Sequence, residues 1–298
     1  MRPRKLGLVL GSGSARGWAH IGVIRVLERA GVKPDLVCGT SVGALVGAAY
    51  AAGDFERFEH WARGLRRKDV IALMDFGMSG GMLKGERLMA FFRRLFEDRD
   101  IGSLGLPFGC VATALHTGAE VWLREGSTVD AVRASTALPG LFTPRLHDGL
   151  TLVDGGLVNP VPVSLGRAMN ADLLIAVDLN ADLVGRHVLV DPPSASMLPD
   201  WRRLLPARIA ARFPVVEAGL EGSTPVPRLP SMLDVLTTSI NVMQVRITRS
   251  RMAGEPPDVT VTPRLAHLGL LDFHRAAEAI EAGERAMEQA LPALEALL

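Results

Sequence analysis

The sequence Gly39-Thr40-Ser41-Val42-Gly43 lies between a short apolar run and a helix-like run. It has the form G-x-S-x-G, with one glycine on each side of the serine at a strand-to-helix turn. Such a turn is too tight for flanking side chains, and it lifts the serine hydroxyl above the sheet, beside the positive end of the following helix. Because this strand–turn–helix context is present, we interpret Ser41 as a nucleophile and the two glycines as requirements of the turn.

Composition places the chain among globular proteins. Of its 298 residues 48% are apolar and 22% are charged, and the net charge of +1 lacks the basic excess typical of nucleic-acid binding. Cys38 and Cys110 both lie inside apolar runs, which argues against a disulfide framework. No apolar run reaches the ~18–20 residues of a membrane span, and the apolar start is short for an export signal. We expect a cytoplasmic protein, and peripheral membrane contact stays open.

The first apolar run, residues 6–10, predicts a buried strand that a glycine-rich loop joins to a helix over 18–30. A dinucleotide fingerprint would need the third glycine one position earlier, and a P-loop would need Gly-Lys-Ser/Thr. The remaining interpretation is an oxyanion hole, in which the backbone N–H groups of residues 12–14 stabilise a developing alkoxide. The loop consists of Gly11, Ser12, Gly13, Ser14, Ala15, Arg16 and Gly17.

These two strands and the helix between them predict a parallel, right-handed βαβ unit. Both loops then lie at the same edge of the sheet, where the carboxyl ends of the strands form a crevice. We therefore expect the oxyanion donors and Ser41 to meet in space.

The middle of the chain supplies a candidate partner for the serine. Residues 108–114, 120–123 and 173–178 predict strands, and residues 135–144 form a loop apolar enough to line a binding crevice. A further short strand leads into Asp154-Gly155-Gly156. Taken alone, a carboxylate at a strand end followed by two glycines is compatible with a simple turn.

Three other segments have two interpretations or no regular pattern. Residues 55–100 predict amphipathic helices, either a solvated pair packed on the sheet or a mobile cover that meets an anionic lipid surface. Residues 180–231 are rich in proline and predict an irregular excursion within a single domain spanning residues 1–298. An apolar stripe along residues 232–252 favours core packing over a dimer seam, and Asp272 is expected to cap a closing helix that runs to about residue 294.

The glycine-rich loop ending in Arg-Gly, G-x-S-x-G and D-G-G, in this order and spacing, resemble the patatin-like phospholipase family. The tracts 134–144, 154–162 and 268–277 resemble its bacterial branch, which is related to the catalytic domain of neuropathy target esterase. The family often has glycine where this chain has Ser12 and Ser14, a change that retains the backbone N–H donors.

The resemblance implies a three-layer α/β/α fold with a mainly parallel central sheet and a Ser–Asp dyad. Carried over by position, Ser41 is the nucleophile, Asp154 its base, and residues 11–14 the oxyanion loop. Arg16 would brace that loop or approach a head group. The motif glycines are Gly17, Gly39, Gly43, Gly155 and Gly156. The implied substrate is a lipid or other acyl ester, cleaved as by a phospholipase A or a lysophospholipase through an acyl-enzyme.

Two rival interpretations remain open at this stage. A Ser–His–Asp hydrolase would use His267 or His274, which follow Asp154 in the chain. A non-catalytic regulatory protein would keep the fold without turnover. We find no clustered metal-ligand spacing and expect neither a metal nor a cofactor. The sequence leaves the oligomeric state undetermined.

Overall fold

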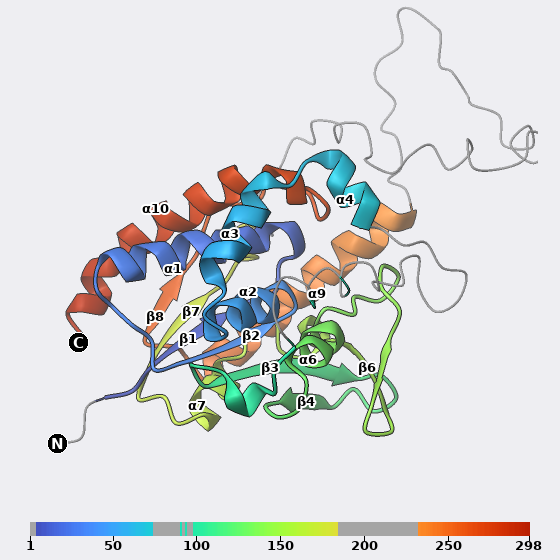
Figure 1. Ribbon diagram of the computed structural model, residues 1–298, viewed down its shortest axis with the longest axis horizontal. Coiled ribbons are helices and arrows are strands. Elements are labelled where there is room, and N and C mark those ends of the chain that lie inside the picture. Colours follow the sequence, from blue (N-terminus) through green and yellow to red (C-terminus); the bar gives the residue numbers. More distant parts are fainter. Residues whose placement is uncertain (1–3, 74–89, 91–92, 94–97, 184–231) are drawn as a thin grey trace, which may run out of the picture.

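The structure is a computed structural model that describes residues 4–73, 90, 93, 98–183 and 232–298 (Figure 1). Within this part of the chain, a mixed α/β fold is built on an eight-stranded sheet of order β5-β6-β3-β2-β1-β7-β8, with β4 paired to β3. The strands are β1 (Leu6–Leu10), β2 (Leu36–Thr40), β3 (Phe108–Ala114), β4 (Glu120–Leu123), β5 (Arg145–His147), β6 (Leu150–Asp154), β7 (Leu173–Val177) and β8 (Val259–Val261).

The centre of the sheet is parallel. Strand β1 pairs in parallel with β2 and β7, and β3 and β8 extend this parallel region on either side. The antiparallel strands β4, β5 and β6 lie at the β3 edge. The predicted parallel arrangement of the first two strands is confirmed. Strand β5 was not predicted, because its three residues, Arg-Leu-His, lack an apolar run.

Side chains alternate between two apolar layers, as the period of a strand requires. Leu8 and Leu10 face one core together with helices α1, α2, α6 and α10. Val9 and Cys38 face the other core, to which α7 contributes Leu165. Helices cover both faces of the sheet, so the predicted three-layer fold is confirmed.

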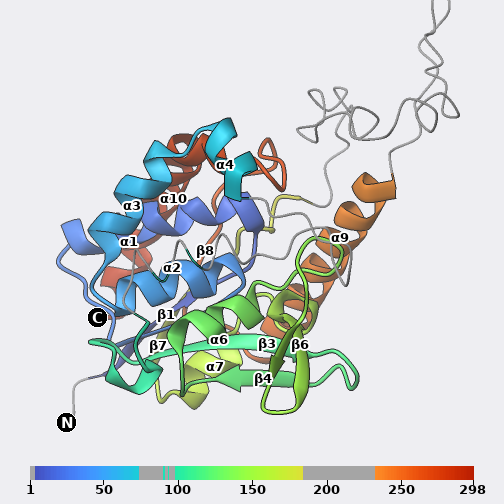
Figure 2. The same cartoon turned by 45° about the vertical axis from the view of Figure 1, so that its right-hand side comes forward.

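The helices are α1 (Ala19–Arg29), α2 (Val42–Ala51), α3 (Phe55–Gly64), α4 (Arg67–Leu73), α6 (Thr128–Ser135), α7 (Val163–Ala168), α9 (Met232–Gly254) and α10 (Ala276–Glu295). Helices α1 and α10 lie side by side over the sheet in both views (Figures 1 and 2). Helix α3 adds an outer wall, and α9 stands beside the ends of β3 and β6. Helices α3 and α4 confirm the helical prediction for the first part of residues 55–100. Most of 74–97 lies outside the described residues, and so does all of 184–231, which holds most of the proline-rich excursion.

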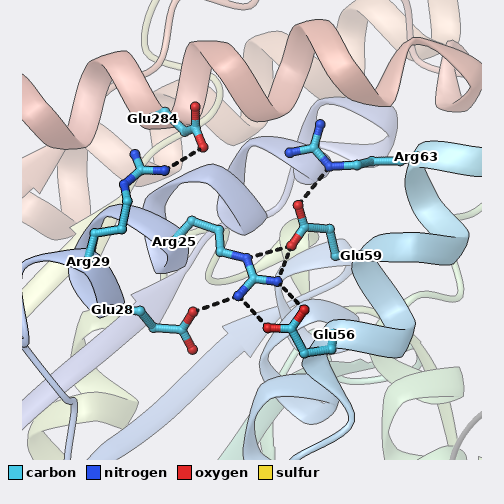
Figure 3. Close-up of polar contacts among 7 residues, drawn as sticks. All are labelled: Arg25, Glu28, Arg29, Glu56, Glu59, Arg63 and Glu284. Atoms are coloured by element: carbon cyan, nitrogen blue, oxygen red, sulfur yellow. Dashed lines mark hydrogen bonds and ion pairs between the residues drawn. The ribbon is translucent and has the colours of Figure 1, made fainter.

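A cluster of ion pairs joins α3 to the α1–α10 pair (Figure 3). The guanidinium of Arg25 on α1 pairs with Glu28 on its own helix and with Glu56 and Glu59 on α3. Glu59 also accepts a hydrogen bond from Arg63 at 2.7 Å. Exposed ion pairs contribute little individually, but a shared guanidinium restricts several side chains together. The cluster therefore holds α3 in a defined position against α1.

Two predictions about helices are wrong in detail. Leu236 and Met243, on the stripe of α9 expected to pack in the core, are 47% and 50% exposed, whereas Gln244 and Thr248 are buried. Asp272 does not cap the closing helix. Its carboxylate accepts a hydrogen bond from the N–H of Gly269 at 2.9 Å and so closes the preceding turn.

Candidate active site

Ser41 occupies a strained turn between β2 and α2. Its φ of 58° and ψ of −123° place a non-glycine residue in a region that costs of order 1–3 kcal/mol. A Cβ atom at Gly43 would overlap the backbone carbonyl of Leu10, and one at Gly39 would overlap the backbone of Gly43. The glycines of G-x-S-x-G are thus required because strand, turn and helix approach one another closely.

The register of β3 brings Asp154 to this turn. Thr40 at the end of β2 pairs with Val111, and Asp154 at the end of β6 pairs with Ala112, the next residue along β3. Strand β4 pairs with both of these β3 residues from the other side, so β2 and β6 lie on the same side of β3. Because β2 runs parallel to β3 and β6 antiparallel to it, their carboxyl ends meet head to head.

Ser41 and the carboxylate of Asp154 are joined by a direct hydrogen bond. Ser41 Oγ donates a hydrogen bond to Asp154 Oδ2 at 2.6 Å, and the N–H of Gly156 donates to Oδ1 at 2.7 Å. Asp154 is 1% exposed, and burial raises the pKa of its carboxyl to about 6, against the opposing effect of these two hydrogen bonds. A carboxylate with this pKa is a stronger base than one in water.

The polar groups of the glycine-rich loop can be accounted for one by one. The N–H of Gly11 donates to Val177 O at 3.1 Å, and the N–H of Ser12 donates to Pro160 O at 2.8 Å. Within the described residues, the N–H groups of Gly13 and Ser14 have no hydrogen-bond partner. The loop, predicted to offer the N–H groups of residues 12–14, therefore presents two that are free to bind an anion.

Arg16 braces this loop from inside the protein. The side chain is 2% exposed, and both its Nε and its backbone N–H donate to Gly13 O, at 3.1 and 3.2 Å. Burial lowers the pKa of the guanidinium to about 10, while the charges of Asp182 and Asp178 oppose that shift. Arg16 therefore remains cationic at neutral pH. Its side chain both bonds the loop and lies among the residues that line the pocket, so both roles considered for it stay predictions.

Ser14 takes a position at which the family often has glycine. Its φ is 52°, in the left-handed region that glycine adopts most easily. The hydroxyl donates to Leu270 O at 2.7 Å, and the N–H of the neighbouring Ala15 donates to the same oxygen at 3.2 Å. These bonds hold the serine in this conformation.

A pocket connects the loop, Ser41 and Asp154, and it encloses about 1020 Å³ of space, counting its open mouth. One apolar wall contains Trp18 and Trp61, whose rings meet edge to face with centroids 5.7 Å apart. A second apolar group in the lining contains Leu138 and Phe142 from the loop that follows α6, together with Ile240 of α9. The prediction that residues 135–144 line a crevice is confirmed.

The two histidines of the rival triad lie elsewhere. His267 is half exposed and lies 3.8 Å from Glu278, and His274 Nε2 accepts a hydrogen bond from Arg67 Nε at 3.2 Å. No histidine is among the described residues that line the pocket. The buried His20 Nε2 donates to Gly11 O at 2.8 Å, so it supports the start of the loop.

Sequence reasoning did not identify several polar residues around the site. Ser135 Oγ accepts a hydrogen bond from the N–H of Ser41 at 2.9 Å and donates to Val111 O at 2.6 Å, which ties the turn to β3. Asn180 and Gln244 are buried beside the oxyanion loop. Asn180 could have been found, because polar residues at the carboxyl ends of parallel strands commonly line sites. Gln244 was missed because the apolar stripe of α9 predicted that its apolar side chains, and not Gln244, would be buried.

The architecture and the position of the pocket define a protein of the patatin fold. A family model described as patatin-like phospholipase matches residues 8–166. The chain belongs to the patatin-like phospholipase family. Family membership supports a lipid-ester hydrolase in general terms.

Relatives and a solved structure agree with this assignment. The chain is 34% identical to a protein of Mycobacterium tuberculosis named "Uncharacterized NTE family protein", with 98% of this chain and 92% of the relative covered. It is 36% identical to human patatin-like phospholipase domain-containing protein 6 over 59% of this chain and 13% of that protein. The crystal structure of VipD from Legionella pneumophila matches with a TM-score of 0.57 and 17% identity, covering 97% of this chain and 67% of that one, which shows a shared fold.

The described part of the chain holds neither a membrane-spanning helix nor a cluster of metal-ligating side chains. None of the helices there is long and apolar enough to cross a bilayer. No group of three or more His, Cys, Asp or Glu side chains in the same part of the chain could hold a metal ion.

Proposed function

We propose that this protein hydrolyses carboxylic esters of lipids by a Ser–Asp dyad through an acyl-enzyme. The observation that carries the proposal is the 2.6 Å hydrogen bond from Ser41 Oγ to the buried carboxylate of Asp154. Beside it lie two backbone N–H groups that have no partner among the described residues. A serine hydroxyl is a weak nucleophile at its own pKa and needs an adjacent base. Asp154, with a pKa of about 6, is ionised at neutral pH and basic enough to accept the proton.

The reaction has two steps. Asp154 takes the Ser41 proton as Oγ attacks the ester carbonyl, and the N–H groups of Gly13 and Ser14 stabilise the tetrahedral oxyanion. Collapse of this intermediate expels the alcohol, which receives the proton from Asp154. Water, deprotonated by the same carboxylate, then attacks the acyl-enzyme and releases the fatty acid, and the proton returns to Ser41.

The pocket supports an acyl chain as the group held beside Ser41. Its lining is mainly aromatic and aliphatic, with few polar groups beyond the dyad, the loop and α9. Burying a fatty-acyl chain against such walls stabilises binding by about 0.8 kcal/mol per CH₂ group. We therefore favour single- or two-chain glycerolipids of the phospholipase A and lysophospholipase classes as substrates.

Fluorophosphonate labelling of wild type and Ser41→Ala, read by intact mass, tests the proposal. We expect one adduct on wild type, none on the variant, and a loss of ester turnover of about 10³-fold or more. Ser103→Ala, which removes an exposed hydroxyl away from the pocket, is the matched control and should label normally. Absence of an adduct on folded wild type would favour the non-catalytic interpretation, and turnover by Ser41→Ala close to that of wild type would overturn the assignment of the nucleophile.

A further inference from the structure

The two unpaired N–H groups of the oxyanion loop belong to peptides whose carbonyl ends are held by side chains. In a trans peptide, the C=O of one residue points opposite to the N–H of the next. The direction of the Gly13 N–H is therefore set by whatever holds Ser12 O. In the same way, the direction of the Ser14 N–H is set by whatever holds Gly13 O.

Asn180 holds the first of these carbonyls. Its Nδ2 donates to Ser12 O at 3.2 Å and also lies 3.3 Å from Gln244 Oε1. Gln244 Oε1 accepts a second hydrogen bond, from Ser12 Oγ, at 3.3 Å. Asn180 is 1% exposed and Gln244 5% exposed, so water does not compete for these bonds. The backbone of Asn180 is itself tied to Asp178, whose Oδ1 accepts from its N–H at 2.9 Å.

Arg16 holds the second carbonyl, and it too has a partner on α9. While Arg16 Nε donates to Gly13 O at 3.1 Å, the NH2 group of the same guanidinium donates to Asn241 Oδ1 at 3.1 Å. Asn241 and Gln244 are three positions apart on α9 and thus project from one face of the helix. Helix α9 is labelled in Figure 2, and it contacts the turn at Gly155–Leu157 that follows β6. The hydrogen bonds of Asn241 and Gln244 bring this face of α9 against the loop.

We propose that Asn180, Asn241 and Gln244 are positioning residues for the oxyanion hole, acting through two separate chains of hydrogen bonds. One chain runs from Gln244 through Asn180 to the Ser12–Gly13 peptide, and the other from Asn241 through Arg16 to the Gly13–Ser14 peptide. Each chain aims one of the two N–H donors at the position of the developing oxyanion. This inference rests on the proposed function, since it concerns the same tetrahedral intermediate.

The kinetic signature separates positioning from substrate contact. An interaction made only in the transition state lowers kcat and leaves KM unchanged when it is lost. Asn180 does not line the pocket among the described residues, so its effect on KM should be negligible. A misdirected donor should lower kcat by about 10- to 100-fold, less than the ~10²–10³-fold loss of a whole donor.

The experiment compares ester hydrolysis, affinity for a trifluoromethyl ketone that forms a tetrahedral adduct with serine, and thermal unfolding. We expect Asn180→Ala and Asn241→Leu to lose kcat and trifluoromethyl-ketone affinity in parallel. The KM of Asn180→Ala should stay within about twofold of wild type, whereas Asn241 lines the pocket and its substitution also tests substrate contact. Asn241→Asp, which retains an acceptor for Arg16, should restore kcat. Thr248→Val is the matched control. Thr248 is buried on α9 one turn beyond Gln244, and its hydroxyl has no partner within the described chain.

Double variants test whether the chains are separate. The effects of Asn180→Ala and Gln244→Leu should not add, because both break the same chain, whereas those of Asn241→Leu and Asn180→Ala should add in free energy. Unchanged kcat in folded Asn180→Ala and Asn241→Leu would overturn the inference, as would a rise in KM alone or an equal loss in Thr248→Val. If Asn180→Ala does not fold, the test rests on the second chain of hydrogen bonds: kcat should fall in Asn241→Leu and be restored in Asn241→Asp. A wild type that neither labels nor turns over would instead overturn the proposed function, and this inference with it.

Discussion

Helices α2 and α9 both border the pocket, yet opposite principles hold them in place. Nine of the ten residues of α2 are buried, and all nine are glycine, alanine, valine or leucine. On α9 the buried positions include Gln244 and Thr248, while Val242 and Met243 are 40% and 50% exposed. The position of α2 thus depends on the burial of apolar area, and that of α9 on directional hydrogen bonds around the oxyanion loop.

The largest expected effect tests how closely α2 is packed. A Cβ atom in Gly43→Ala would overlap the backbone carbonyl of Leu10, which cannot move without distorting β1. We expect a loss of more than about 4 kcal/mol in the free energy of unfolding, or no folded protein. The matched control is Gly254→Ala at the end of α9, where an added Cβ meets no atom of the described residues within 4 Å. Urea unfolding measures both, and equal stability of the two variants would show that α2 is not closely packed.

The second prediction concerns Asp154, which lies between the two helices. It accepts a hydrogen bond from Ser41, the residue before α2, and two positions further on Gly156 lies close to Gln244 of α9. Its pKa is raised from 3.8 to about 6, mainly by burial, so ionisation of this carboxyl destabilises the fold. The stabilisation that comes with the neutral carboxyl is fully present below 3.8, its pKa in the unfolded chain. It is lost as the pH rises through about 6, its pKa in the folded protein. Asp154→Asn should therefore stabilise the protein by about 3 kcal/mol at pH 7.5, and by roughly half of that at pH 5.

Urea unfolding at the two pH values checks this prediction, with Asp148→Asn on an exposed turn as the control. The same substitution should abolish turnover, since an amide cannot accept the Ser41 proton. In the wild type, kcat/KM should rise through about pH 6 as the carboxyl ionises. A destabilised Asp154→Asn would mean that the charged form is better accommodated than its burial indicates.

The smallest effect comes from one substitution made on each helix. Val46→Ala on α2 removes two methyl groups from a side chain with 0% exposure and should cost about 1–3 kcal/mol. Val242→Ala on α9 should change stability by less than about 0.5 kcal/mol, because that side chain is 40% exposed. Thermal unfolding of the pair measures the contrast. Similar losses would show that the outer face of α9 is packed after all.

Sequence reasoning succeeded where the determining contacts are local. The strand–turn–helix around Ser41, the glycine-rich loop after the first strand and the carboxylate before two glycines were all recognisable from neighbouring residues. Short apolar runs marked β3 and β7 because the centre of a mainly parallel sheet is buried on both faces. Sequence reasoning missed strand β5 and the buried face of α9. Neither has a pattern of apolar residues that matches the side chains buried there.

The sequence by itself determined most of the elements and the strand–turn–helix around Ser41, because tight turns and buried strands constrain which amino acids can occupy them. The resemblance to the patatin-like family added Asp154 as the second residue of the proposed dyad. Only the tertiary structure decided which N–H groups remain unpaired, since the partners of Gly11 and Ser12 are Val177 and Pro160, far along the chain. It also decided that α9 holds the loop, because Ser12 and Gln244 are separated by 232 positions. Hydrogen bonds of that range depend on how distant elements pack together, which no local pattern records.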